Sequence, residues 1–308
     1  MKTNFQAIRY FFAPAICAVL VITSRAEAQN MFEANDGSGI VYQYTPTGVQ
    51  STFASGLNEA HDVAFNSAGD LFVSSINNIY EYTPGGMQST FATGLGFPEG
   101  ITFNSTGNLF VADNSAGIIY EYTPAGARST FATGLSGPAQ IAFNSVGDLF
   151  VADQTGGTIT EITPGGTKST FASGLLTPYG LAFNSAGNLF VGSQGSDSIF
   201  EYTPGGIRST FAAVVSHPFG LAFDSTGNLF VVSAGTPGGL DTGDIFEYSP
   251  AGARSTFFSG LGITSGDENS GMAFQGVALP VPEPSTIALA GLGTTALCLW
   301  RRRSAIVP

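Results

Sequence analysis

An internal repeat constrains the fold of this chain more than any other feature. Four short patterns recur six times in the same order: an Ala/Thr-Phe pair, a Leu-Phe-Val-like run, a Tyr-x-Tyr-Thr-Pro-like run and a Ser-Thr-Phe run. Successive Ser-Thr-Phe copies lie 38, 40, 40, 40 and 46 residues apart. Self-similarity at such a period indicates a repeat architecture, in which each copy is one supersecondary unit that covers its apolar surface against its neighbours.

Each unit is predicted to be a four-stranded antiparallel sheet. Asn-Ser-x-Gly separates the first two patterns and Thr-Pro-x-Gly separates the last two, and their glycines supply the positive φ that tight hairpins require. The Leu-Phe-Val runs have no polar alternation, as expected for a strand covered on both faces. The Arg/Lys-Ser-Thr-Phe runs carry charge, as expected for an outer edge. Six such sheets in a ring make an all-β, six-bladed β-propeller.

The phase of the repeat predicts how the ring closes. The segment Met31–Asn35 corresponds to the second pattern, whereas Gly271–Phe274 corresponds to the first. We therefore expect the C-terminal strand to pair into the N-terminal blade as its innermost strand.

The first 28 residues are predicted to be a secretory signal peptide, followed by the propeller at 29–280. Lys2 and Arg9 precede an apolar run at 11–22, and an Ala-x-Ala cleavage site ends at Ala28. Signal peptidase would remove this segment. An N-terminal membrane anchor is the alternative, although the apolar run is shorter than the ~20 residues that span a bilayer.

Composition narrows the classes of partner. Both cysteines, Cys17 and Cys298, lie in the end segments, so the body can form no disulfide. Between residues 29 and 280 there are four Lys and Arg residues against twenty Asp and Glu residues. This acidic balance disfavours nucleic acid and anionic lipid as partners. We expect an exported monomer.

One repeat resembles the NHL family of six-bladed propellers, whose units read approximately Pro-x-Gly-Ile-Ala-Phe-Asp-x-x-Gly-Asn-Leu-Tyr-Val-Ala-Asp. The segment Pro98–Asp113 follows this pattern closely, and the resemblance extends over the repeats. It implies the propeller fold. Because the family includes lyases, lactonase relatives and binding modules, it implies no single function.

The C-terminal segment, 281–308, resembles the PEP-CTERM sorting signal of Gram-negative bacteria. Pro282, Glu283 and Pro284 are followed by an apolar run at 287–300 and by the cluster Arg301, Arg302 and Arg303. The resemblance implies a hydrophobic transmembrane helix, processing by an exosortase, and location in the cell envelope, at the cell surface or in the extracellular matrix. A simple C-terminal anchor is the alternative, with the arginines on the cytoplasmic side.

The positions beside the ring axis are the first candidate site. The Pro-x-Gly position before each first-pattern strand differs from copy to copy, although the repeat itself does not require that variety. The predicted ligand-binding face comprises His61, Glu99, Gln140, Tyr179, Phe219 and Ser270. Neutral drift of loop positions is the alternative interpretation.

Two expanded loops near the end of the repeat are the second candidate site. They lie at 235–244 and 262–269, and both are predicted to cover the seam between the last and first blades. Carboxylate and amide oxygens among glycines are the ligands that calcium prefers. The candidate calcium ligands are Asp241, Asp244, Asp267, Glu268 and Asn269. Solvated loops that seal the ring are the alternative.

Two functions remain open from the sequence. The first is a non-catalytic binding module that takes an extracellular glycan, a surface protein or a cation, associated with exopolysaccharide or biofilm. The second is a metal-dependent lactonase- or lyase-like enzyme that uses His61, Asp62 and Glu99 at the axis.

Overall fold

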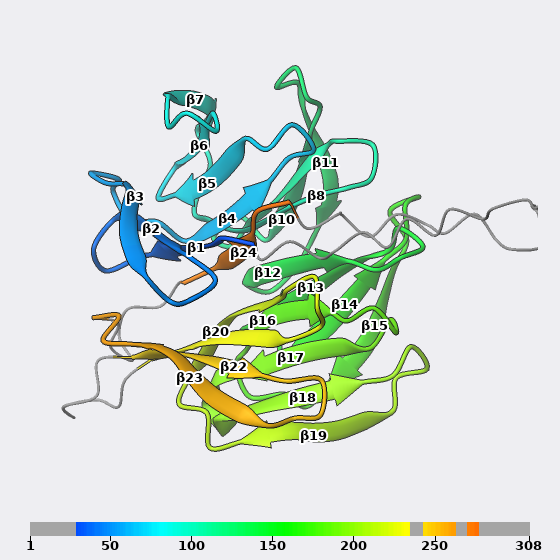
Figure 1. Ribbon diagram of the computed structural model, residues 1–308. Helices are drawn as coiled ribbons and strands as arrows, with labels where there is room; N and C mark the ends of the chain where they lie inside the picture. The colour runs from blue at the N-terminus through cyan, green and yellow to red at the C-terminus, as the bar shows by residue number, and fades with distance from the viewer. Residues whose placement is uncertain (1–28, 235–242, 263–269, 277–308) are drawn as a thin grey trace, which may run out of the picture.

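The protein forms six four-stranded antiparallel sheets that are arranged as the blades of a ring (Figure 1). The computed structural model describes residues 29–234, 243–262 and 270–276. Within these ranges lie twenty-four strands and one short 3-10 helix, η1 (Gln194–Ser196). The predicted all-β, six-bladed propeller is therefore confirmed.

The strands of each blade follow one another outward from the axis. The first three blades consist of β24 (Met272–Phe274), β1 (Met31–Asn35), β2 (Ile40–Tyr44) and β3 (Gln50–Ala54); β4 (Asp62–Phe65), β5 (Leu71–Ser75), β6 (Asn78–Tyr82) and β7 (Gln88–Thr93); and β8 (Pro98–Phe103), β9 (Leu109–Asp113), β10 (Ile118–Tyr122) and β11 (Arg128–Thr133). The other three consist of β12 (Pro138–Phe143), β13 (Leu149–Asp153), β14 (Thr158–Ile162) and β15 (Lys168–Ser173); β16 (Pro178–Phe183), β17 (Leu189–Ser193), β18 (Ser198–Tyr202) and β19 (Arg208–Ala213); and β20 (Pro218–Phe223), β21 (Leu229–Ser233), β22 (Asp244–Tyr248) and β23 (Arg254–Ser259).

The C-terminal strand closes the ring as predicted. β24 pairs antiparallel with β1, with Met31 opposite Phe274 and Glu33 opposite Met272. The backbone N–H of Ala34 donates to the carbonyl of Gly271 at 3.0 Å. β24 also lies beside β4 and β20, the inner strands of the two flanking blades. The first blade therefore joins the two ends of the described chain.

A repeated aromatic contact holds neighbouring blades together. In the third blade, Phe110 on the second strand meets Phe131 on the outer strand and Phe143 on the next blade's inner strand, both edge to face with ring centroids 5.0 Å apart. Equivalent contacts recur around the ring, and all five residues of each second strand are buried. Edge-to-face pairs of this kind add to the stabilisation from apolar burial.

The two faces of the ring carry different loops. On the upper face lie the links that lead into the inner strands and the loops between second and third strands; the two kinds of Gly-containing hairpin turn lie on the lower face. Met31 begins β1 and Phe274 ends β24 at the lower face, where the N–H of Gln275 donates to the carbonyl of Asn30 at 2.9 Å. The described chain thus enters and leaves the propeller through its lower face.

The predicted end segments lie outside the described residues. These are the signal peptide at 1–28 and the sorting segment at 281–308, including its apolar run. Within the described ranges, no helix is long and apolar enough to span a membrane.

Candidate functional site

The axial positions predicted from the repeat lie at the upper ends of the inner strands. In four blades the pairing between inner and second strands skips two residues there, as between Pro98 and Ile101, and the skipped residues sit beside the axis. All of the predicted ligand-face residues are buried, with exposed fractions of 7% or less: His61, Glu99, Gln140, Tyr179, Phe219 and Ser270. They line the interior of the ring at this level.

Tyr179 lies among acidic side chains at this level. Burial, and after it the negative charges of Glu99, Asp62 and Asp36, raise the pKa of the Tyr179 phenol well above its usual value. The Tyr179 ring packs edge to face on Phe219, with centroids 5.7 Å apart. The axis therefore combines an apolar half, contributed by the fifth and sixth blades, with an acidic half contributed by the first three.

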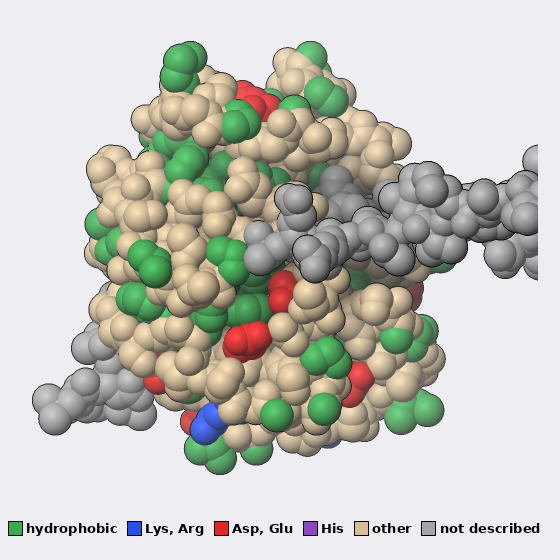
Figure 2. Space-filling model, viewed as in Figure 1, with side chains coloured by type: hydrophobic (Ala, Val, Ile, Leu, Met, Phe, Trp, Pro, Cys, Tyr) green, Lys and Arg blue, Asp and Glu red, His purple; other side chains and the backbone are tan. Residues whose placement is uncertain are grey.

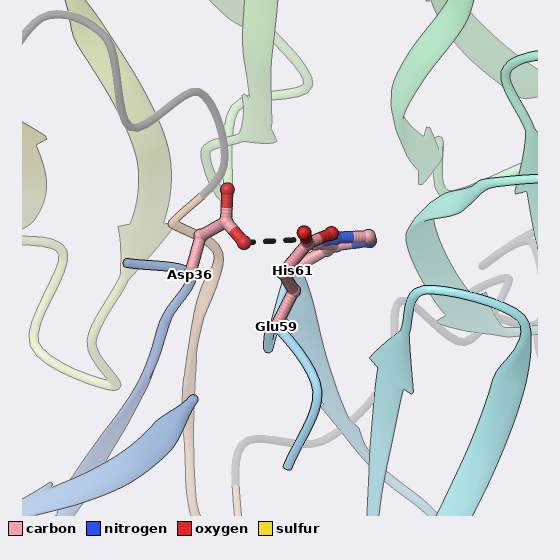
Figure 3. Close-up of side chains that lie close together, drawn as sticks. All are labelled: Asp36, Glu59 and His61. Carbon is pink, nitrogen blue, oxygen red and sulfur yellow. Dashed lines mark hydrogen bonds and ion pairs between the residues drawn. The ribbon is translucent and has the colours of Figure 1, made fainter. Parts of the chain in front are cut away.

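Three side chains converge on the upper face where the first and second blades meet (Figure 3). Asp36 follows β1, whereas Glu59 and His61 precede β4. The Nε2 atom of His61 lies 3.2 Å from Glu59 Oε2 and 3.7 Å from Asp36 Oδ1. His61 is completely buried, whereas the side chains of Glu59 and Asp36 are 40% and 14% exposed. We call Asp36, Glu59 and His61 the boundary triad.

The orientation of His61 follows from its other contacts. Its Nδ1 atom lies 2.7 Å from the carbonyl oxygen of Pro98, and its ring packs on Phe97 with centroids 4.6 Å apart. A carbonyl oxygen can only accept, so Nδ1 must carry the hydrogen. In the neutral ring, Nε2 then presents its lone pair to the carboxylates of Glu59 and Asp36.

Asp62 faces away from the boundary triad, although it is the next residue in the chain. Its Oδ2 accepts a hydrogen bond from the N–H of Ile101 at 2.8 Å. With Gln140 it lines the upper end of an axial cavity of about 200 Å³, whose lower end is lined by Phe65 and Phe274. Burial raises the pKa of Asp62 to about 7, and backbone hydrogen bonds and the nearby amide of Gln140 only partly oppose that rise. His61 and Asp62 therefore serve different parts of the axis.

Glu33 is a buried acid that the sequence reasoning did not single out. It occupies, in β1, a position that is valine in every other blade, and it is completely buried. The Tyr44 hydroxyl donates to Glu33 Oε2 at 3.4 Å. Burial raises the pKa of Glu33 to about 8, and the nearby polar side chains of Tyr44, Ser270 and Asn35 only partly oppose that rise.

Asp36 and Glu59 were also not predicted from sequence. A column-by-column comparison of the copies could have found them, because no other blade boundary within the described residues has acidic side chains at both equivalent positions. Of the predicted seam ligands, Asp244 begins β22. Asp241, Asp267, Glu268 and Asn269 lie outside the described residues.

The basic residues of the described propeller lie at its rim. Its four basic residues all begin outer strands: Arg128, Lys168, Arg208 and Arg254. The three arginines stack over aromatic rings of the neighbouring third strands, about 4.9 Å from the centroids. Lys and Arg side chains are scarce on the face drawn in Figure 2. Close to the axis, Glu33, Asp36, Glu59, Asp62 and Glu99 thus have no Lys or Arg among the described residues to neutralise them.

The fold and the C-terminal segment define an exported six-bladed β-propeller. Residues 280–303 match the PEP-CTERM protein-sorting motif. This motif indicates export, processing by an exosortase, and association with the cell surface of a Gram-negative bacterium. No curated protein matches the chain in sequence.

Solved propellers resemble the chain in structure. Virginiamycin B lyase from Staphylococcus aureus is 14% identical, with a TM-score of 0.56 over 73% of this chain and 87% of the lyase chain. A chain of a nidogen/laminin complex is 18% identical, with a TM-score of 0.67 over 80% and 98% of the two chains. A protein of unknown function from Bacteroides caccae is 17% identical, with a TM-score of 0.62 over 81% and 100%. At these identities the likeness supports the fold alone.

Proposed function

We propose that this protein is a non-catalytic binding module that presents the upper face of its propeller to an extracellular ligand, with a polysaccharide of the matrix as the first candidate. One observation carries the proposal. The described chain leaves the ring at Gly276 on the lower face, opposite the boundary triad, and the sorting segment follows Gly276 in the sequence. Attachment through that segment would turn the acidic upper face away from the membrane.

The character of the upper face supports binding. The partly exposed carboxylates of Glu59 and Asp36 lie above the buried His61, at the upper ends of the inner strands. Function is often carried by loops that a rigid scaffold positions. Uncharged or cationic ligands suit this face better than polyanions, because the Lys and Arg side chains of the described residues all lie on the outer strands, away from these acids.

Binding can be tested by affinity electrophoresis of the purified protein in gels that contain polysaccharide from the culture medium of its host. Retardation that is lost in a Glu59→Gln/Asp36→Asn double variant supports the proposal. The matched control is Glu81→Gln/Glu121→Gln, which removes the same charge from third strands and should bind normally. If polysaccharide slows the wild type no more than it slows the double variant, each compared with its own mobility in a gel without polysaccharide, the proposal is contradicted.

A metal-dependent lactonase- or lyase-like enzyme is the second candidate. The observation that favours it is the convergence of one histidine and two carboxylates near the axis. The structural likeness to virginiamycin B lyase suggests one substrate to include. Turnover of simple lactones or of virginiamycin B, lost in His61→Ala, would favour this candidate over the binding module.

A further inference from the structure

The boundary triad brings the Nε2 atom of His61 close to two carboxylates. With Nδ1–H of His61 committed to the Pro98 carbonyl, the neutral ring turns an acceptor toward two further acceptors, Glu59 Oε2 and Asp36 Oδ1. His61 is completely buried and the side chain of Asp36 is only 14% exposed, so water reaches the triad mainly beside Glu59. A positive charge between these atoms stabilises the group, and either a second proton on Nε2 or a bound metal ion can supply it.

We propose that the boundary triad binds one divalent metal ion of the Zn²⁺ or Mn²⁺ class, through His61 Nε2 and one oxygen each of Glu59 and Asp36. The inference deepens the proposed function, because it supplies the upper face with a metal whose remaining positions can take ligand oxygens.

The distances fit such an ion. Metal–ligand bonds of ~2.1 Å at tetrahedral angles place neighbouring ligand atoms ~3.4 Å apart. The two contacts of Nε2 are 3.2 and 3.7 Å, and the three ligand atoms all lie within 4.8 Å of one another. Only small side-chain adjustments would therefore be needed.

The surroundings of His61 also match those of a metal ligand. Metal-binding histidines usually donate their second ring N–H to a carbonyl or carboxylate, which fixes the tautomer and the ring direction. The Pro98 carbonyl fills this role, and Phe97 holds the ring from one side. An imidazole with two carboxylates favours Zn²⁺ or Mn²⁺ over Ca²⁺, which prefers a shell of oxygens.

One side of the triad reaches solvent. Glu59 and Asp36 are partly exposed, whereas His61 lies beneath them. Three protein ligands with an open position are typical of metal sites that exchange water for another molecule. A hydroxyl or carboxylate oxygen of the extracellular ligand could occupy that position.

Isothermal titration of the purified, EDTA-treated protein with Zn²⁺, Mn²⁺ and Ca²⁺ tests the proposal. We expect one equivalent of Zn²⁺ or Mn²⁺ to bind, at least tenfold more tightly than Ca²⁺, and more tightly at pH 8 than at pH 6 because protons compete for Nε2. His61→Ala should weaken binding at least a hundredfold, and Glu59→Gln or Asp36→Asn at least tenfold.

The matched control is His217→Ala. His217 Nδ1 also lies 3.7 Å from a carboxylate, that of Asp197, but it is more exposed and lacks a second acid in the described structure. This variant should bind metal as the wild type does. If no Zn²⁺ or Mn²⁺ binds at millimolar concentration, or if His61→Ala binds as tightly as the wild type, the proposal is wrong.

The outcomes also separate the metal site from the proposed function. If polysaccharide still retards the protein in EDTA, and the titrations show no metal binding, the binding module is supported and the metal site is wrong. If the protein binds metal and His61→Ala does not, but no polysaccharide retards the protein, the metal site is supported and polysaccharide is excluded as the ligand. An electron paramagnetic resonance spectrum of bound Mn²⁺ that changes on addition of polysaccharide would connect the two.

Discussion

Replacing Glu33 by valine should stabilise the protein and remove much of its dependence on pH. In the unfolded chain this carboxyl loses its proton near pH 4.5, whereas in the folded protein it does so at about pH 8 because burial disfavours the charge. When folding raises the pKa of a group, its contribution to stability is fully present below the pKa of the unfolded state. That contribution is lost as the pH rises to the pKa of the folded state. At ~1.36 kcal/mol per pH unit, this loss amounts to about 3 kcal/mol at pH 7 and about 5 kcal/mol above pH 8.

Valine is a suitable replacement because the other blades already carry it at this position. Val73, Val111, Val151, Val191 and Val231 occupy the same position in the other blades, and all are completely buried. Four of these blades also keep a tyrosine at the position of Tyr44. The substitution therefore removes a titrating carboxyl and requires no change in the backbone conformation.

The measurement is urea unfolding followed by circular dichroism at pH 4.5, 6, 7, 8 and 9. We expect Glu33→Val to gain about 3 kcal/mol at pH 7 with an unchanged m-value, since the surface exposed on unfolding is the same. Glu33→Gln is the matched control, because it keeps the shape and polarity but cannot ionise. Its stability should vary less with pH than that of the wild type between pH 4.5 and 8. If the wild type and Glu33→Gln vary equally with pH, Glu33 does not stay protonated and the reasoning fails.

Three further predictions concern the axis and the blade contacts. In the wild type, the raised pKa of Asp62 should lower the free energy of unfolding as the pH rises from about 4 to about 7. Asp62→Asn should remove this loss, measured by the same pH series. Gly180→Ala should lower the free energy of unfolding by about 1–3 kcal/mol, because its methyl group would overlap the Phe219 carbonyl oxygen; Gly85→Ala, which meets no close neighbour, should change it by less than about 0.5 kcal/mol in the same urea assay. Phe150→Ala should cost about 3–5 kcal/mol, seen as a lower urea midpoint, because its ring contacts both the outer strand and the next blade.

The fold could be predicted because each strand type appears six times. A single Leu-Phe-Val run is also compatible with a buried helix segment, and only its recurrence between two Gly-containing turns makes it a strand. The phase of the repeat then predicted the pairing of β24 with β1, which is confirmed. The six copies could therefore be compared with one another in the way that homologous sequences are compared in an alignment.

The site was less predictable, because its members come from different blades. The repeat placed His61 near the axis but could not pair it with Asp36, which precedes it by 25 residues. The catalytic group predicted from the sequence, His61, Asp62 and Glu99, stays a prediction, and it includes two consecutive residues whose side chains point to different sides of the backbone. In the structure His61 contacts Glu59 and Asp36, whereas Asp62 lines the cavity below.

The other blade boundaries show what the scaffold alone requires. At the position of Asp36 they carry Ile76, Asn114, Gln154, Gln194 and Ala234, and at that of Glu59 the described ones carry Phe97, Gly137, Thr177 and His217. These residues sit on nearly the same backbone, so a propeller blade needs neither acid to form. Buried or clustered acids lower stability unless something neutralises them. Glu33, Asp36, Glu59, His61 and Asp62 nevertheless all fall within one stretch of 30 residues in the first two blades. Because the repeat does not need these charges and stability disfavours them, the search for a ligand should begin at this boundary.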